Sequence, residues 1–414
     1  MNLRKKYYIF LFLCTFIICS IFWLIIPKSY KIIESSDYLY YYKPAAQNIL
    51  NLIPIEGIEP NKIGYKYVPL FPIFLSILFK LSSITSIDEN IIIYYFSVLC
   101  LAVSSIILYE ISRIFWSEKK SLFISLIFIT YPLILWFIKQ PNPESLFTPL
   151  LFASILFFIK AKTSNKDNLL YFLSGLFIGF SMLTRPIAIG LTVIFGLFYL
   201  YQNNFIKNMS KKVLINLLLI NIGTILVVLP WEYYVYSKEN KIILLSTNGA
   251  AGVYDGLTFN ANLKNYRLKK QLPEDMESLI NRFNNQLNIN STLGDIISTL
   301  FSEFKDNPIT VIKLYLYKSL RALYGTDSQR NEIPISIIQI FYFTLIISSI
   351  IIVRKNVLFG EFDLFFITLF IYFWFMATTS LSIVRYMTPI MGIFFIFLPS
   401  LSINLLKHLY KKSI

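Results

Sequence analysis

Long apolar segments alternate with short polar segments from one end of the chain to the other. Each apolar segment is a solid block without period-2 alternation, which excludes the strands of a transmembrane barrel. A helix needs about 20 residues to cross a hydrocarbon core, and a backbone in lipid must satisfy its own polar groups. The pattern therefore predicts an all-α polytopic membrane protein with about ten spans. The predicted spans are residues 7–26, 91–112, 121–138, 145–160, 169–184, 187–201, 213–231, 335–353, 362–379 and 389–406.

The composition agrees with a membrane protein. Of the 414 residues, 56% are hydrophobic and 15% are charged, whereas soluble domains have about 25% charged residues. The net charge of +15 is concentrated between apolar blocks, which indicates orientation in the membrane rather than a nucleic-acid partner. The three cysteines lie in apolar runs and the one histidine, His408, lies in a basic tail. These residues predict neither a disulfide framework nor a metal site.

The basic clusters predict the orientation of the spans. The first apolar run, 7–26, lacks the cleavage site of a signal peptide and is interpreted as a retained span. With ten spans, all basic clusters fall on one side, which the positive-inside rule makes cytoplasmic. This assignment of sides requires that the short apolar segment 69–81 lies at the membrane interface and does not cross the membrane. Segment 308–324, which mixes apolar residues with lysines and an arginine, has the same interpretation. The clusters are Arg4/Lys5/Lys6, Arg113/Lys119/Lys120, Lys160/Lys162/Lys166, Lys207/Lys211/Lys212, Arg354/Lys355 and Lys407/Lys411/Lys412.

Three regions follow along the chain. Residues 1–231 hold seven spans and a first outer loop, 27–90, with interfacial helices. Residues 232–334 form an outer polar region with one interfacial helix, and residues 335–414 hold the last spans. The predicted location is the inner (plasma) membrane, with any active site on the extracellular or periplasmic face.

Asp37 stands early in the first outer loop, in Ser35-Ser36-Asp37-Tyr38. It has two interpretations. A carboxylate at the membrane surface is a general base if it reaches an acceptor hydroxyl. It is equally an N-cap for a short interfacial helix.

Other outer positions offer cations and a second carboxylate. Lys66 precedes Val68-Pro69 and either meets a phosphate or belongs to a rigid turn. Glu144 opens a span, where it either favours the helix dipole or contacts substrate. Arg185 and Arg385 lie beside apolar spans; an arginine at membrane depth marks a functional site unless it snorkels to headgroups.

Together these residues suit transfer chemistry on a lipid-phosphate substrate, with a base for the nucleophile and cations for a phosphate leaving group. Nothing in the sequence resembles a Walker loop, a dinucleotide fingerprint or a zinc motif. An enzyme that uses cytoplasmic nucleotides is therefore disfavoured.

In their order, these pieces resemble the GT-C glycosyltransferases, and most closely the protein O-mannosyltransferase and lipid A aminoarabinose transferase group. The resemblance covers the whole chain and is densest over residues 30–235. The matching pieces are Asp37 after the first span, Tyr67-Val68-Pro69-Leu70-Phe71-Pro72, Tyr131-Pro132 followed by Glu144, Gly175-Leu176-Phe177-Ile178-Gly179, Leu183-Thr184-Arg185-Pro186, Pro230-Trp231 and Arg385-Tyr386-Met387-Thr388-Pro389.

Two departures concern the site. Mannosyltransferases usually carry an Asp-Glu pair, whereas Tyr38 follows Asp37 here. Many relatives have an arginine shortly after Pro-Trp, whereas this chain continues from Trp231 with Glu232. The phosphate ligands and the sugar therefore stay open.

The resemblance implies a fold and a reaction. The fold is a GT-C-like bundle. The donor is a sugar on a polyprenyl phosphate, and the acceptor is a lipid, glycan or protein hydroxyl that Asp37 deprotonates, with inversion at the sugar. Arg185, Lys66 and Arg385, in that order, are the expected phosphate ligands, and Glu144 and Tyr386 are expected to contact substrate. No cofactor besides the lipid-linked donor is implied, because arginine and lysine can stabilise a monophosphate; a divalent metal stays open.

Two other functions stay open. A flippase or transporter for lipid-linked oligosaccharides would also have many spans, but usually shows inverted repeats. An O-antigen polymerase or ligase is likewise polytopic, with a large outer loop.

Overall fold

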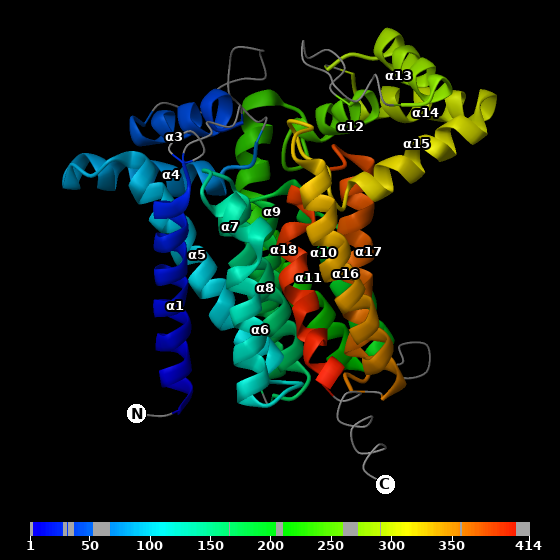
Figure 1. Ribbon diagram of the computed structural model, residues 1–414. Coiled ribbons are helices and arrows are strands. Elements are labelled where there is room, and N and C mark those ends of the chain that lie inside the picture. The colour runs from blue at the N-terminus through cyan, green and yellow to red at the C-terminus, as the bar shows by residue number, and fades with distance from the viewer. Residues whose placement is uncertain are drawn as a thin grey trace. The chain divides into compact units, whose positions relative to one another are not determined.

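The computed structural model describes residues 3–27, 31, 37–52, 67–164, 166–203, 210–259, 272–289, 291–356 and 358–402. All regular elements in these ranges are helical (Figure 1). The chain forms two compact units. The first comprises Met1–Ser246, Ser348–Phe366 and Met391–Ile414, and the second comprises Thr247–Ile347 and Ile367–Ile390.

Six described helices are long and apolar enough to cross a membrane. They correspond to six of the ten predicted spans. They are α1 (Leu3–Ile25), α5 (Glu89–Ser112), α8 (Glu144–Ala161), α11 (Lys211–Glu239), α16 (Glu332–Lys355) and α17 (Phe362–Thr379).

A seventh candidate span is bent. Helices α6 (Glu118–Thr130) and α7 (Pro132–Ile138) qualify together but meet at 54°. The bend lies at Tyr131, whose backbone is extended (φ −64°, ψ 120°). A proline disfavours helical geometry in the residue before it, so Pro132 ends α6 and starts α7.

The other three predicted spans are shorter apolar helices. They are α9 (Asp167–Met182), the pair η2 (Pro186–Ala188) with α10 (Leu191–Gln202), and the pair α18 (Thr388–Phe394) with η5 (Phe395–Ser400). The membrane-spanning helical fold is thus confirmed, whereas the count of ten stays a prediction.

The first loop contains short helices, as its sequence predicts. One π-helical turn, η1 (Tyr38–Tyr42), leads into α3 (Lys43–Leu50), and α4 (Leu70–Thr85) follows. Ser86 ends α4 in the left-handed conformation (φ 56°), and Asp88 caps α5 by accepting a hydrogen bond from the Asn90 amide at 2.9 Å. In Figure 1, α3 and α4 run across the direction of α1. This direction suits the predicted interfacial position of segment 69–81.

Helices α9 and α11 pack closely at glycines. A Cβ atom on Gly175 would lie 2.1 Å from the carbonyl oxygen of Ile220, and one on Gly223 would lie 2.5 Å from that of Phe172. The Thr224 hydroxyl donates to the Gly175 carbonyl at 3.1 Å. Small residues let membrane helices approach at backbone distance, so this contact fixes α9 and the residues that follow it.

Basic clusters from several spans meet at one end of the first unit. Glu110 of α5 accepts hydrogen bonds from Arg113 at 2.8 Å, Lys160 at 3.1 Å and Tyr8 at 2.6 Å. Lys212 pairs with Asp167 at 2.7 Å. The start of α9 and the end of α8 thus lie at the same end as the start of α1, which agrees with the predicted parity of these clusters.

The second unit has its own core. Helices α12 (Asn248–Thr258), α13 (Glu274–Gln286), α14 (Leu293–Asp306) and α15 (Pro308–Arg321) enclose it. A Thr292–Asp295 capping box starts α14, because each side chain binds the backbone amide of the other residue. Buried residues from all four helices form the core, including Leu257, Leu279, Phe283, Ile296 and Leu314.

Candidate active site

Asp37 does not cap a helix. Its own backbone is already helical (φ −61°, ψ −42°), and its side chain makes no capping hydrogen bond to η1. Instead, its Oδ1 accepts a hydrogen bond from the Tyr67 hydroxyl at 3.1 Å. The capping interpretation of Asp37 is therefore wrong.

Tyr67 is held in place by other aromatic side chains. Its ring centroid lies 5.0 Å from that of Tyr41 and 4.7 Å from that of Tyr42, and Tyr42 in turn makes an edge contact with Phe71 at 5.1 Å. Burial, with the nearby Asp37 carboxylate, raises the pKa of Tyr67 well above its usual value. The phenol thus stays a hydrogen-bond donor toward Asp37 at neutral pH.

The segment that carries Tyr67 is joined to the end of α9. The backbone amide of Leu70 donates to the carbonyl of Leu183 at 3.0 Å. Leu183 is two residues before Arg185. This bond links two sequence motifs that are more than 100 residues apart in the chain.

Arg185 pairs with Glu144. Its Nη1 lies 2.6 Å from Glu144 Oε1, and the two side chains are only 10% and 8% exposed. The sequence offered Arg185 as a phosphate ligand or a snorkelling cation and Glu144 as a sugar contact or a helix-dipole partner. Arg185 is buried, so the snorkelling interpretation is wrong. Glu144 does begin α8, at the end opposite to Lys160.

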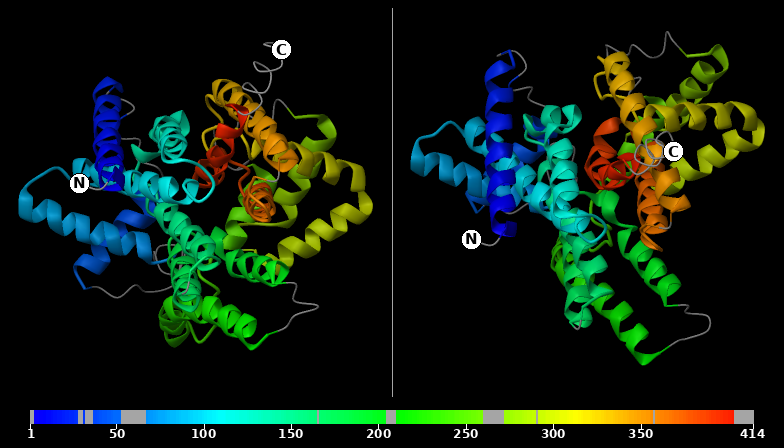
Figure 2. Two further views of the ribbon diagram at one scale, coloured as in Figure 1. Left: turned by 90° about the horizontal axis from the view of Figure 1, so that it is seen from below. Right: turned by 60° about the horizontal axis from the view of Figure 1, so that its bottom comes forward.

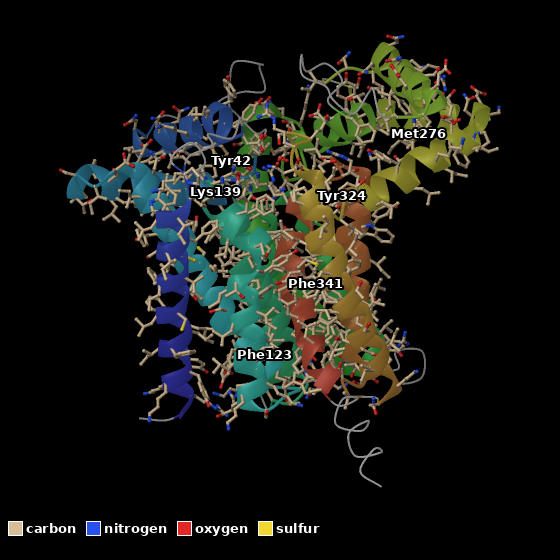
Figure 3. The ribbon with its side chains drawn as sticks, in the orientation of Figure 1. Tyr42, Phe123, Lys139, Met276, Tyr324 and Phe341 are labelled. Carbon is tan, nitrogen blue, oxygen red and sulfur yellow. The ribbon has the colours of Figure 1, made fainter. Side chains whose placement is uncertain are left out.

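Lys139, the residue that follows α7, is a second buried cation of the first unit. Its side chain is buried, and its amine lies 3.7 Å from the ring centroid of Trp136. Burial lowers the pKa of Lys139 to about 8. Figure 3 shows Lys139 and Tyr42 at the same end of the first unit, with Phe123 toward the other end.

Arg385 and Tyr386 lie in the second unit, in the turn η4 (Val384–Tyr386). Arg385 is 9% exposed and faces Asp327 at 3.6 Å. Arg321, which sequence reasoning placed only in an interfacial helix, organises this region. It donates to the backbone carbonyls of Leu381 and Ser382 at 3.3 Å each, and pairs with Glu332 at 2.7 Å.

A small open depression lies beside Arg321 in the second unit. Its lining mixes charged, polar and apolar side chains, namely Asp255, Phe259, Arg321, Thr326, Asp327, Gln329, Leu381 and Ile383.

Lys66 lies outside the described residues. Within the described ranges, no three histidine, cysteine or acidic side chains gather as metal ligands would.

The sequence analysis did not single out Tyr67 or Lys139 as candidate site residues. Tyr67 begins the segment Tyr67-Val68-Pro69-Leu70-Phe71-Pro72, which carries part of the family resemblance. Lys139 directly follows an apolar span that ends near a tryptophan. A cation at that position, next to an aromatic ring, was the available signal.

Comparison with known protein families gives a match to part of the chain. The sequence profile of the dolichyl-phosphate-mannose-protein mannosyltransferase family matches residues 66–234. That range includes Tyr67, Glu144 and Arg185, whereas Asp37 precedes it. A search of curated protein sequences gives no match.

Solved structures give a second comparison. The oligosaccharyltransferase AglB from Archaeoglobus fulgidus, in complex with an inhibitory peptide and a dolichol-phosphate, aligns with a TM-score of 0.58 and 11% identity, over 100% of this chain and 52% of that chain. The structure of the Archaeoglobus fulgidus oligosaccharyltransferase in the apo form gives a TM-score of 0.57, 13% identity and the same coverage. ArnT from Cupriavidus metallidurans, bound to undecaprenyl phosphate, gives a TM-score of 0.46 and 12% identity over 93% of this chain and 76% of that one.

The chain thus spans about half the length of the oligosaccharyltransferase. The likeness at this low identity concerns the fold, and the predicted fold class, a membrane helix bundle of the GT-C type, is confirmed.

Proposed function

We propose that this multi-pass membrane protein, in which residues 66–234 match the sequence profile of the dolichyl-phosphate-mannose-protein mannosyltransferase family, is a glycosyltransferase that uses a polyprenyl-phosphate sugar. The acceptor is a hydroxyl on a lipid, glycan or protein. The observation that carries the proposal is the Asp37–Tyr67 hydrogen bond. The Asp37 carboxylate makes no side-chain cap to η1, and its partner Tyr67 lies at the start of the segment that matches the family profile.

In the proposed reaction, Asp37 accepts the proton of the acceptor hydroxyl. The acceptor oxygen forms a bond to the anomeric carbon while the bond from that carbon to the phosphate oxygen breaks. The electron pair of that bond leaves with the polyprenyl phosphate, and attack from the opposite face inverts the anomeric centre. One proton and one sugar move, so no oxidant or reductant is needed.

Arg185 is the proposed partner of the leaving phosphate. An arginine binds phosphate oxygens through paired N–H donors and stays charged in a low-dielectric site. Glu144 holds the guanidinium at 2.6 Å and so positions it before the donor arrives. The dolichol-phosphate in the AglB structure supports a lipid monophosphate as the ligand of this fold.

Arg385 and Tyr386 are proposed as further substrate contacts, and Lys66 keeps its proposed role as a phosphate ligand. The active site is proposed to face the outside, because Glu144 and Lys160 lie at opposite ends of α8 and basic residues stay inside. A cysteine at Asn248 should react with an impermeant maleimide in intact cells, and one at Lys166 should not. Equal labelling of the two would contradict this orientation.

The direct test is transfer from labelled polyprenyl-phosphate sugars by the protein in nanodiscs, followed by the mass of the product. A new glycosylated acceptor supports the transferase, whereas sugar-lipid that only changes leaflet would favour a flippase. Release of a lipid diphosphate from an oligosaccharide donor would favour a polymerase or ligase.

Asp37→Asn should lower turnover by about 10²–10⁴-fold, the typical contribution of a positioned base. Asp88→Asn is the matched control, because Asp88 caps α5 and asparagine caps equally well. Full activity of folded Asp37→Asn protein would end its assignment as the base.

A further inference from the structure

Helix α15 has two of its three charged side chains inside and a row of large apolar side chains outside. Lys318 and Arg321 are 0% and 3% exposed. The residues that point away from the unit are large and apolar, with exposed fractions of 49–69%: Ile309, Ile312, Leu316 and Leu320. A helix whose outer face contacts water shows the opposite distribution.

Helix α14 carries a matching apolar stripe. Its members recur every three or four residues and therefore share one face of the helix. Their exposed fractions are 45–71%, and they are Leu293, Ile297, Phe301 and Phe304. The next sector of the helix is polar and exposed, with Ser298, Ser302 and Lys305.

The apolar face of α15 continues onto a membrane span of the same unit. Trp374 of α17 donates from its indole nitrogen to the carbonyl of Ser319 in α15 at 2.7 Å. Helix α17 is a candidate span, so the end of α15 is tied to a helix that lies in lipid. Figures 1 and 2 show α15 leaving α16 and α17 at an angle rather than running along them.

Cations border the apolar stripes. Lys313, at the edge of the α15 stripe, pairs with Asp275 of α13 at 2.9 Å. Lys305 lies at the edge of the α14 stripe. Long basic side chains beside an apolar stripe suit the headgroup layer above an acyl-chain boundary.

We propose that α14 and α15 form one membrane-binding surface, whose apolar stripes insert together at the boundary between headgroups and acyl chains. In the region 232–334, the sequence predicted an interfacial position for segment 308–324 alone. The structure adds α14, and it explains why two cations of α15 are directed into the protein. The inference does not depend on the proposed catalytic activity.

Spin labels can measure this insertion in the full-length protein in nanodiscs. Single cysteines are placed at Ile297, Phe301, Ile312 and Leu316, in a background in which Cys14, Cys19 and Cys100 are replaced. We expect these labels to collide more with oxygen than with a water-soluble nickel complex. Labels at Ser298 and Ser302, on the polar sector of α14, should show the reverse order.

Three outcomes would overturn the proposal. Nickel-dominated collisions at Ile297 and Phe301 would place α14 in water. Oxygen-dominated collisions at Ile312 and Leu316 alone would confine insertion to α15. Low collision rates with both reagents, together with spin–spin broadening, would show that a second copy of the chain covers the stripes.

A second measurement needs no cysteine replacement. Phe301→Trp and Leu316→Trp should each add fluorescence that brominated acyl chains quench, relative to the parent protein. Ser302→Trp should add fluorescence that these lipids leave unchanged. Equal quenching of all three added tryptophans, or of none, would contradict the proposed orientation.

Discussion

Arg185 and Glu144 form a buried ion pair at 2.6 Å, between the residue that follows α9 and the first residue of α8. Both side chains lie at the end of the spans that also holds the Asp37–Tyr67 pair, because the Leu70 amide binds the Leu183 carbonyl. The cation that is proposed to bind the donor phosphate is thus already held by a carboxylate. From this pair we derive separate predictions for the binding of the lipid donor and for the stability of the protein.

The first prediction concerns the lipid donor. Arg185→Ala should raise the KM for the polyprenyl-phosphate sugar, and Arg185→Lys should recover part of the loss because the charge stays. The measurement is initial rate against donor concentration in nanodiscs. Arg113→Ala is the control, since it removes a paired arginine at the opposite end of the unit and should leave the donor KM unchanged. An unchanged KM in folded Arg185→Ala protein would remove Arg185 from the phosphate site.

The second prediction concerns stability. Removing one partner of a buried pair leaves an uncompensated charge and costs about 3–5 kcal/mol, so Glu144→Gln should lower the melting temperature clearly. Glu361→Gln breaks a pair with Lys162 whose side chains are 43% and 44% exposed, and such pairs contribute about 0–1 kcal/mol. Thermal unfolding of both variants in the same detergent gives the comparison. Equal melting temperatures for the two variants would show that the Glu144–Arg185 pair contributes little to the stability of the protein.

The third prediction assigns Tyr67 a positioning role. Tyr67→Phe removes the hydroxyl that binds Asp37 but keeps the ring contacts with Tyr41 and Tyr42. A hydrogen bond to a charged group contributes about 1.5–3 kcal/mol, so kcat should fall by about tenfold or more while the donor KM stays unchanged.

Two comparisons test this role of Tyr67. Tyr94→Phe, which removes a hydroxyl bound to the Cys19 carbonyl at 2.6 Å, should leave kcat unchanged. In the Asp37→Asn background, Tyr67→Phe should cost little more, because coupled residues are non-additive. Additive losses would place Tyr67 outside the catalytic pair.

Sequence patterns predicted the long apolar helices but not the contacts between them. Apolar length determines which segments cross lipid, and proline at position 132 explains where one of them bends. The Glu144–Arg185 and Asp37–Tyr67 pairs join residues 41 and 30 positions apart. Such contacts depend on how helices pack, and one sequence offers several partners of equal chemistry for each charge.

The sequence also did not predict that Lys318 and Arg321 of α15 are buried. Its lysines and arginine were visible, but whether they faced water or protein depends on which stripe packs against the core. The glycines of α9 show the opposite case. Gly175 and Gly179 were noted only as parts of a family pattern, and the structure gives their reason in the close approach to α11.

The fourth prediction tests that approach. Gly175→Ala would bring a Cβ to 2.1 Å from the Ile220 carbonyl, so α9 and α11 must separate. Overpacking typically costs about 1–3 kcal/mol, and the shift should also raise the donor KM because Arg185 follows α9. Gly249→Ala in α12, with no atom within 4 Å of its Cβ, should be neutral or slightly stabilising. A melting temperature for Gly175→Ala equal to that of the parent would show that the helices separate at no cost.

The last prediction concerns the dependence of stability on pH. The Lys318 amine is fully buried, 5.3 Å from the centroid of the Tyr315 ring, and within the described residues it has no hydrogen-bond partner. Burial, with the neighbouring charge of Arg321, lowers the pKa of Lys318 to about 7, whereas an unfolded lysine has a pKa of about 10.4. Between these values the unfolded chain binds a proton that the folded chain does not. The free energy of unfolding therefore rises with pH from about 7 to about 10. Below pH 7, the buried Lys318 amine lowers the free energy of unfolding the most.

Lys318→Met, which keeps the length of the apolar stem, should stabilise the protein most at pH 6–7 and least near pH 10. Melting temperatures of parent and variant across this range, at constant ionic strength, give the difference curve. Lys313→Met is the control, because that amine is 54% exposed and paired with Asp275. The difference in melting temperature between parent and Lys313→Met should not show this dependence on pH. A difference between parent and Lys318→Met that does not change with pH would mean that the buried amine stays protonated in the folded protein.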